Sequence, residues 1–486
     1  MNSYHIDKKE WHLNRSLFLL LQKTNKEKLF MEREKLKSRL GFILISAGCA
    51  IGIGNVWKFP WMAGQYGGGI FVLIYLLCLL VMGVPALTME FTLGRASQKS
   101  PVRLYQALEK DGQKWHIHGY VSYVGNIILL MFYTMVAGWM LQYFVLTANG
   151  TFIGLDNAGI SGVFGSVLQS PGSMLTYTGI IVLISTIVCA MGVQNGLEKV
   201  SKIMMISLLV IMVILAINSI ILPGAAEGLK FYLLPDLAAF KEKGIINVLV
   251  AAMNQAFFTL SIGMGSMAIF GSYIGKDRAL MGEAVRVSLL DTFVAITSGL
   301  IIFPACFAYG VDVGSGPSLI FETLPNIFNN LAFGRVWGSL FFVFMTFAAL
   351  STVFAVLENI ISCTMELTKM NRMKASIISG IGIFVLSIPC ILGFNVWSNV
   401  TILNGAKNIM DIEDLLVSNI ILPLGALVYI IFCTTRWGFG WKNFTDEANT
   451  GKGMKVANWM RGYITFVLPV IILVIFVLGM ISYFNV

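Results

Sequence analysis

The sequence predicts an all-α polytopic membrane protein with about eleven transmembrane helices. The chain has 486 residues, of which 57% are hydrophobic and only 12% are charged, and its mean hydropathy is +0.78. An average soluble domain is roughly 25% charged. The predicted spans are residues 40–64, 70–93, 118–147, 174–191, 200–222, 247–274, 284–311, 336–366, 375–394, 409–434 and 460–484.

The basic residues predict the orientation of these spans. With the N-terminus in the cytoplasm, 28 of the 34 Lys and Arg residues lie on the cytoplasmic side and 5 on the outer side. Loops rich in Lys and Arg remain inside, so we expect an N-in, C-out topology. The net charge of +9 follows from this topology, and no motif supports nucleic-acid binding.

Composition and motifs disfavour several classes of function. All seven cysteines lie in predicted spans without a CxxC motif, which disfavours a disulfide framework or a zinc site. The histidines lie outside the predicted spans, except for His118 at the first residue of the third span, and the spans contain no suitably spaced carboxylate pair, so an intramembrane enzyme is disfavoured. The nucleotide-binding pattern GxxxxGK[ST] is also absent from the sequence, which disfavours an ATP-driven pump. We expect no enzymatic activity and no cofactor.

Residues 1–32 read as an N-terminal cytoplasmic extension. Met31 begins a basic run directly before the first span, which favours Met31 as the true start. The alternative is an amphipathic tail that lies on the membrane surface.

The first span has a composition that an uninterrupted membrane helix would not tolerate. Its segment Ser46–Pro60 contains three glycines together with Asn55 and Lys58. Broken helices survive in a bilayer only where protein or a cavity satisfies the freed backbone groups. Such a break offers carbonyls to cations and a half-helix N-terminus to anions, as transporter sites do.

The sixth span repeats this pattern. Gln255–Ser266 carries polar side chains together with Gly263 and Gly265 in mid-span. Glycines in one span would be consistent with close helix packing alone. Corresponding breaks five spans apart instead favour a binding site between two halves of the chain.

Few charged or paired hydroxyl side chains lie in the spans. Glu90, Asp291 and Glu358 are functional candidates because charge is costly in lipid, although each could instead belong to a structural pair. Ser351 and Thr352 share a helix face with Ala348 and could bind a small cation through oxygen. The alternative is that both hydroxyls bond back to their own helix.

These motifs resemble the neurotransmitter:sodium symporter family, in its bacterial amino-acid transporter branch. The matching motifs are Arg39-Leu-Gly-Phe, Gly52-Ile-Gly-Asn-Val-Trp-Lys-Phe-Pro60, Gly67-Gly-Gly-Ile-Phe, Gly83-Val-Pro-Ala-Leu-Thr-Met-Glu90, Phe231-Tyr-Leu-Leu-Pro-Asp236, Gln255-Ala-Phe-Phe-Thr-Leu-Ser-Ile-Gly-Met-Gly265 and Gly271-Ser-Tyr. The resemblance implies a LeuT-type fold, a five-plus-five inverted repeat with unwound helices one and six, in the bacterial cytoplasmic membrane. A transporter core would span 33–434, with repeats at 40–222 and 247–434. Residues 435–486 would form a cytoplasmic loop and the eleventh helix.

The resemblance also implies two sodium sites and one substrate site. The first sodium site would use Ala50, Asn55, Thr259, Asp291 and the substrate carboxylate. The second would use the carbonyls of Gly48, Ile51 and Ala348 with the hydroxyls of Ser351 and Thr352. The substrate site would comprise Cys49, Ala50, Gly52, Ile53, Gly54, Leu129, Tyr133, Phe258, Thr259, Ser261, Met264 and Val356. In this mapping Gly52 leaves room for a substrate carboxylate, and Tyr133 would reach that carboxylate.

Asp291 departs from relatives that are neutral at this position. In chloride-dependent relatives an anion lies near Tyr75, Gln255 and Thr259, whereas Ala295 here offers no hydroxyl ligand. The fixed carboxylate of Asp291 could replace the anion, so we expect chloride-independent transport. Protonation of Asp291 on the return step would add proton antiport.

The gates follow from the same mapping. Lys58 and Asp414 resemble the outer gate, with lysine in place of the usual arginine. Arg33 and Glu366, assisted by Tyr273, resemble the inner gate. Two departures affect the inner end: Leu36 stands at the place of a tryptophan, and the glycine–proline pair of the fifth span reads Gly196 and Ile206.

The resemblance implies a sodium-coupled symporter that imports a neutral, hydrophobic or aromatic L-amino acid by alternating access. Its partners would be the amino acid, Na⁺ and the lipid bilayer, and it would act as a monomer or weak dimer. One alternative is a proton-coupled amino-acid permease of the same architecture. Another is an amino-acid sensor or a transport-inactive homologue.

Overall fold

The computed structural model describes residues 36, 38–310, 313, 319–400 and 408–484. Arg33 and the predicted extension 1–32 lie outside these residues. The described residues form helices without a named β-strand, and two isolated bridges join Gly68 to Pro235 and Arg278 to Lys452.

Each of the eleven predicted spans corresponds to a helix or a set of consecutive helices. The first five spans are α2 (Arg39–Ala50) with η1 (Gly54–Lys58) and α3 (Phe59–Gln65); α4 (Gly69–Cys78) with η2 (Leu79–Gly83) and α5 (Val84–Ser97); α7 (His116–Ala148); α9 (Pro171–Ala190); and η3 (Val193–Glu198) with α10 (Lys199–Ile220). The segments labelled η are π-helical, so their backbone hydrogen bonds join residues i and i+5 rather than i and i+4.

The later spans follow the same scheme. They are α13 (Ile245–Thr259) with α14 (Ser266–Gly271); α15 (Leu280–Ala308); α17 (Gly334–Thr368); α18 (Arg372–Leu392); α19 (Ile409–Asp414) with η5 (Leu415–Ile421) and α20 (Leu422–Thr434); and α22 (Met460–Gly462) with η6 (Tyr463–Val467) and α23 (Leu468–Phe484). Short helices in the connections are α6 (Pro101–Leu108), α8 (Asn157–Leu168), α11 (Ala225–Leu233), α12 (Leu237–Glu242), η4 (Leu319–Thr323), α16 (Leu324–Asn330) and α21 (Trp441–Ala448).

Nine helices in the described part of the chain are long and apolar enough to cross a membrane, and the bent pair α2 and η1–α3 makes a tenth. The sixth predicted span does not reach this length because its break leaves α13 with 15 residues and α14 with 6.

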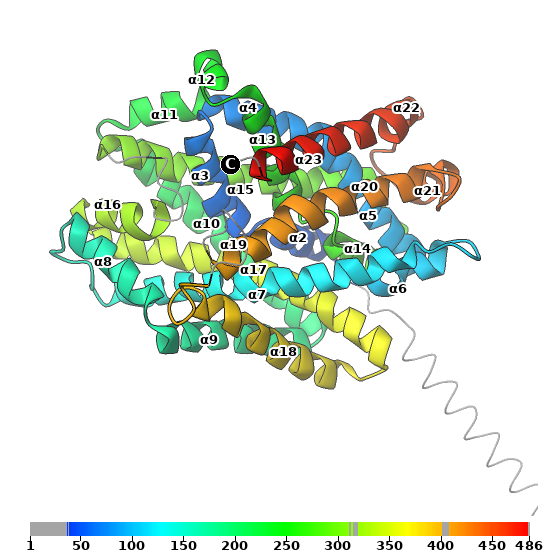
Figure 1. Ribbon diagram of the computed structural model, residues 1–486, viewed down its shortest axis with the longest axis horizontal. Coiled ribbons are helices and arrows are strands. Elements are labelled where there is room, and N and C mark those ends of the chain that lie inside the picture. The colour runs from blue at the N-terminus through cyan, green and yellow to red at the C-terminus, as the bar shows by residue number, and fades with distance from the viewer. Residues whose placement is uncertain (1–35, 37, 311–312, 314–318, 401–407, 485–486) are drawn as a thin grey trace, which may run out of the picture.

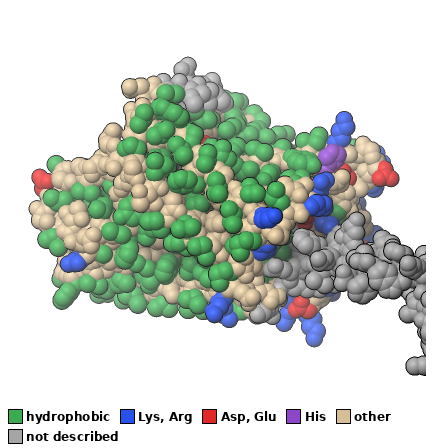
Figure 2. Space-filling model, turned by 90° about the horizontal axis from the view of Figure 1, so that it is seen from below, with side chains coloured by type: hydrophobic (Ala, Val, Ile, Leu, Met, Phe, Trp, Pro, Cys, Tyr) green, Lys and Arg blue, Asp and Glu red, His purple; other side chains and the backbone are tan. Residues whose placement is uncertain are grey.

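The two longest helices, α7 and α17, cross the middle of the bundle (Figure 1). The most apolar stretch of α17 is 83% buried, whereas that of α23, at the edge of the bundle, is 17% buried. Figure 2 shows hydrophobic side chains over the broad middle of one outer face, with Lys and Arg gathered mostly toward one end. Such a surface suits a hydrocarbon environment between two polar layers.

The helices are interrupted at the two predicted places. Between α2 and η1 the backbone becomes extended at Ile51, and the two halves meet at an angle of 53°. Between α13 and α14, Ser261, Gly263 and Gly265 have φ values of 50°, 103° and 72°. These left-handed conformations favour glycine and cannot continue a right-handed helix.

Candidate functional site

The breaks of the first and sixth spans face each other at mid-bundle. The Ser261 hydroxyl donates to the Cys49 carbonyl at 3.2 Å. The Gln255 amide donates to the Gly54 carbonyl at 2.8 Å. The Ser261 side chain therefore partners a carbonyl at the first break, and Gln255 of α13 adds a second donor to the Gly54 carbonyl, which also accepts from Phe59 N.

Freed N–H groups also find partners from several helices. Gly52 N donates to Asn55 Oδ1 at 3.1 Å, and Ile53 N donates to the Tyr133 hydroxyl on α7 at 2.8 Å. In the sixth span, Gly263 N donates at 2.5 Å to Glu90, which is fully buried on α5. Glu90 thus caps the second break, since an unpaired amide is costly inside a bilayer.

The predicted side chains of the first sodium site form a buried cluster around Asp291 on α15. Asn55 Nδ2 lies 2.8 Å from Asp291 Oδ1, and Thr259 Oγ1 lies 3.1 Å from both carboxylate oxygens. The Tyr75 hydroxyl donates to Asp291 Oδ2 at 3.4 Å. This arrangement gathers oxygen ligands of the kind that bind hard cations, including one carboxyl group.

The predicted second sodium site brings α17 against the end of α2. Ser351 Oγ lies 3.0 Å from the Ile51 carbonyl and 2.8 Å from that of Ala348. Thr352 Oγ1 lies 3.4 Å from the carbonyls of both Gly48 and Ile51. Five oxygens without a carboxylate therefore converge at the break, which suits a small monovalent cation.

Between the two breaks lies a pocket with an empty volume of about 320 Å³. Its lining is mainly apolar and comprises Cys49, Ala50, Gly52, Gly54, Leu129, Tyr133, Phe258, Ser261, Met264, Thr352, Val417 and Leu422. A Cβ atom on Gly52 would lie 2.2 Å from the Tyr133 hydroxyl oxygen and 2.3 Å from Thr352 Oγ1. Glycine is therefore required here for the tyrosine to approach the break.

Three predicted pocket residues lie elsewhere. Val356 is fully buried one turn beyond Thr352 on α17 and does not line the pocket. Ile53 lines a second, outer pocket, and the Thr259 hydroxyl faces Asp291. The role of Val356 in substrate binding stays a prediction.

Val417 and Leu422, on the tenth span, line the pocket but were not predicted. The Gly263 carbonyl would lie 2.0 Å from a Cβ on Gly425, so the sixth-span break lies directly against this helix. The π-helical segment η5 alters which residues face inward, and a regular helical periodicity misses this change. Gly425 is the sequence signal for the close approach.

The predicted contact of the outer gate is present. Lys58 Nζ lies 3.0 and 3.1 Å from the two carboxylate oxygens of Asp414 and 3.2 Å from Ser418 Oγ. The ammonium nitrogen also lies 4.2 Å from the centre of the Phe258 ring. Because Phe258 lines both the inner pocket and the outer pocket of about 660 Å³, Lys58 contacts both Asp414 and the ring shared by the two pockets.

The inner end differs from the predicted arrangement. Arg33 lies outside the described residues, and Glu366 accepts from the backbone N–H of Ser100 at 3.0 Å and from its hydroxyl at 2.7 Å. The Tyr273 hydroxyl donates at 2.7 Å to Glu358, which forms an ion pair with Arg372 at 2.7 Å. The hydroxyl of Tyr273 thus supports the Glu358 pair, a contact that the sequence did not predict.

Two broken helices in contact, two oxygen clusters and a mainly apolar pocket between them are typical of secondary membrane transporters. The chain belongs to the sodium:neurotransmitter symporter family, whose sequence pattern matches residues 33–153 and 159–486. It is a sodium-dependent, multi-pass membrane symporter, as the resemblance of its motifs predicted.

Individual relatives agree with this assignment. A sodium-dependent transporter of Bacillus subtilis, YhdH, is 34% identical over 450 residues, which cover 92% of this chain and 98% of the relative. One from Haemophilus influenzae is 33% identical, with the same coverage. The crystal structure of MhsT in complex with L-phenylalanine matches with a TM-score of 0.84 and 37% identity, over 92% of this chain and 100% of that chain. The likeness confirms the predicted LeuT-type fold.

The second oxygen cluster leads to a test of sodium dependence. Thr352→Val removes one oxygen at nearly constant shape, and we expect the sodium concentration for half-maximal activation to rise by about ten-fold or more. Thr346→Val is the matched control, because Thr346 lies on the same helix and its hydroxyl bonds back to the Phe342 carbonyl at 2.7 Å. Equal sodium dependence in both variants would show that the cluster does not bind sodium.

Proposed function

We propose that the protein imports a neutral, hydrophobic or aromatic L-amino acid together with sodium. The observation that carries this proposal is the pocket between the breaks. Gly52 and Tyr133 provide a polar corner at a half-helix N-terminus, and the remaining walls are largely apolar. A carboxylate fits the polar corner because backbone N–H groups and the helix dipole favour negative charge there.

The other parts of the pocket fit the rest of such a substrate. The Cys49 carbonyl and the Ser261 hydroxyl, 3.2 Å apart, supply oxygens for the substrate ammonium group. Leu129, Met264 and Val417 supply an apolar surface for its side chain. None of the lining residues carries a formal charge, so a charged substrate side chain would remain uncompensated. The L-phenylalanine in the MhsT complex supports this substrate class.

Sodium and substrate would be coupled by their position. Ala50 lines the pocket, and Thr259 belongs to the Asp291 cluster directly beside Phe258. A sodium ion in that cluster would lie next to the substrate carboxylate, so each ligand would increase the affinity for the other. The membrane potential then adds about 2.3 kcal/mol per charge per 100 mV to the driving force.

Alternating access would use the two ends of this pathway. Lys58, Asp414 and Phe258 would close the outer end, and Glu366 and its neighbours the inner end. We further propose a location in the bacterial cytoplasmic membrane with the N-terminus inside, which the distribution of basic residues supports. In this proposal the protein works as a monomer or weak dimer.

The direct test is uptake of individual labelled amino acids into proteoliposomes under a sodium gradient. We expect uptake of L-phenylalanine, L-leucine or L-tryptophan with sodium and none when choline replaces sodium. Uptake of lysine or glutamate should be negligible because the pocket has no compensating charge. Equal uptake in choline would refute sodium coupling and favour a proton-coupled permease. Substrate binding without uptake would favour a sensor.

Chloride independence is tested separately at Asp291. We expect uptake by the unmodified protein to be the same in chloride and in gluconate. Asp291→Asn removes the buried negative charge, so its uptake should fall by about ten-fold or more in gluconate and recover partly with chloride. Asp414→Asn is the control, because that carboxylate is half-exposed and belongs to the gate. Chloride dependence of the unmodified protein would contradict the proposal.

A further inference from the structure

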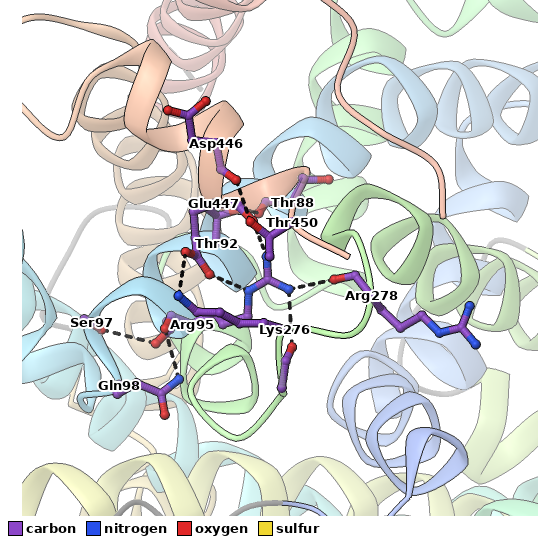
Figure 3. A network of polar contacts seen from close by, with 12 residues as sticks. Thr88, Thr92, Arg95, Ser97, Gln98, Lys276, Arg278, Asp446, Glu447 and Thr450 are labelled. Atoms are coloured by element: carbon purple, nitrogen blue, oxygen red, sulfur yellow. Dashed lines mark hydrogen bonds and ion pairs between the residues drawn. The ribbon is translucent and has the colours of Figure 1, made fainter. Parts of the chain in front are cut away.

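A buried arginine at the end of the second span joins three segments of the chain. Arg95, on the last turn of α5, is 1% exposed. Its guanidinium donates to Glu447 Oε1 at 2.6 Å, to the Glu447 carbonyl, and to the carbonyls of Gly275 and Arg278 at 3.3 and 2.7 Å. Figure 3 shows this side chain between Glu447 of α21 and the loop that carries Lys276 and Arg278.

The loop and α21 are also connected through their backbones. Lys452 N donates to the Asp277 carbonyl at 2.9 Å, and Ala279 N donates to the Lys452 carbonyl at 3.1 Å. A Cβ on Gly451 would lie 2.4 Å from Arg278 N, so the segment after α21 lies directly on the loop. Arg95 therefore sits beneath a junction that is already closely packed.

The inner half of the sixth span also packs closely against the second span. A Cβ on Gly94 would lie 1.9 Å from the Ala268 carbonyl oxygen, and a Cβ on Gly271 would lie 2.4 Å from that of Phe91. These contacts bring the backbones of α5 and α14 together without intervening side chains. Glycine on both sides lets the two helix backbones approach closely.

On its other side, α21 follows the tenth span after a tight turn. Phe439 N and Gly440 N both donate to the Phe432 carbonyl of α20, at 2.8 and 3.3 Å. The tenth span carries Asp414 of the outer gate and Val417 of the pocket wall. The Arg95 cluster is thus a junction between the helix that carries the outer gate and the inner half of the sixth span.

We propose that Arg95 is a positioning residue of the transport cycle, which clamps α14 and its following loop to α21 so that the sixth and tenth spans change position together. This inference rests on the alternating-access transport proposed above. Arginine suits the role because its planar fork donates in several fixed directions, whereas lysine donates from a single nitrogen. The two carbonyls of the loop and the two oxygens of Glu447 require that fork.

The clamp predicts a selective loss of transport rate. In Arg95→Lys and Glu447→Gln we expect the maximal uptake rate to fall by about ten-fold, because conformational steps limit many transport and catalytic cycles. Equilibrium binding of sodium and L-phenylalanine should stay within about two-fold, since Arg95 contacts neither candidate site. Lys276→Gln is the matched control: Lys276 pairs with the same carboxylate at 3.5 Å but is 67% exposed, and we expect it to transport normally.

Hydrogen exchange of the full chain in lipid nanodiscs tests the clamp without a substrate. We expect exchange in both clamp variants to increase in residues 272–280 and 441–454 and to remain unchanged in α7 and α17. If Arg95→Lys does not fold, Glu447→Gln decides the question. Normal transport and exchange in Glu447→Gln would overturn the proposal, as would increased exchange throughout the protein. A failure of L-phenylalanine uptake in the unmodified protein would instead count against the proposed substrate.

Discussion

The structure depends on one constraint: backbone groups freed by two broken helices must find partners inside the membrane. In the described residues, Glu90 binds the amide of Gly263, and Tyr133 binds that of Ile53. Ser351 and Thr352 lie against the carbonyls at the end of α2. Because an unpaired amide or carbonyl costs several kcal/mol in hydrocarbon, these partners make the interruptions tolerable.

The same constraint explains why binding groups collect at the breaks. A carbonyl that accepts from a hydroxyl can also face a cation, and an amide that donates to Tyr133 lies beside the pocket. The pocket shares Thr352 with the second oxygen cluster, and Phe258 of its lining precedes Thr259 of the first cluster in the chain. In the proposed mechanism this proximity is the physical origin of coupling between sodium and the amino acid.

Much of the fold and site could be predicted from the sequence because the informative residues are unusual within membrane spans. Asn55 and Asp291 are polar side chains within apolar spans, and the structure brings them to 2.8 Å. The contact between Lys58 and Asp414 was predicted only through the family resemblance, since 356 residues separate them. The family and the fold were confirmed, whereas the functional roles of these residues remain predictions.

Other features could not be predicted from local sequence patterns. Val417 and Leu422 line the pocket because η5 is π-helical, and periodicity rules assume a regular α-helix. Arg372 and Glu447 read as ordinary charges near loops, yet they pair with the buried Glu358 and Arg95. Such pairings depend on how loops pack, and neither local propensity nor hydropathy records that packing.

In the proposed mechanism, sodium and the amino acid bind to one shared site at the two breaks. The most direct test of this mechanism is reciprocal equilibrium binding of sodium and L-phenylalanine to the purified protein, with choline as the replacement cation. We expect sodium to increase the affinity for L-phenylalanine and L-phenylalanine to increase the affinity for sodium by the same factor. L-phenylalanine binding that is unchanged between sodium and choline would show that the two ligands do not share a site.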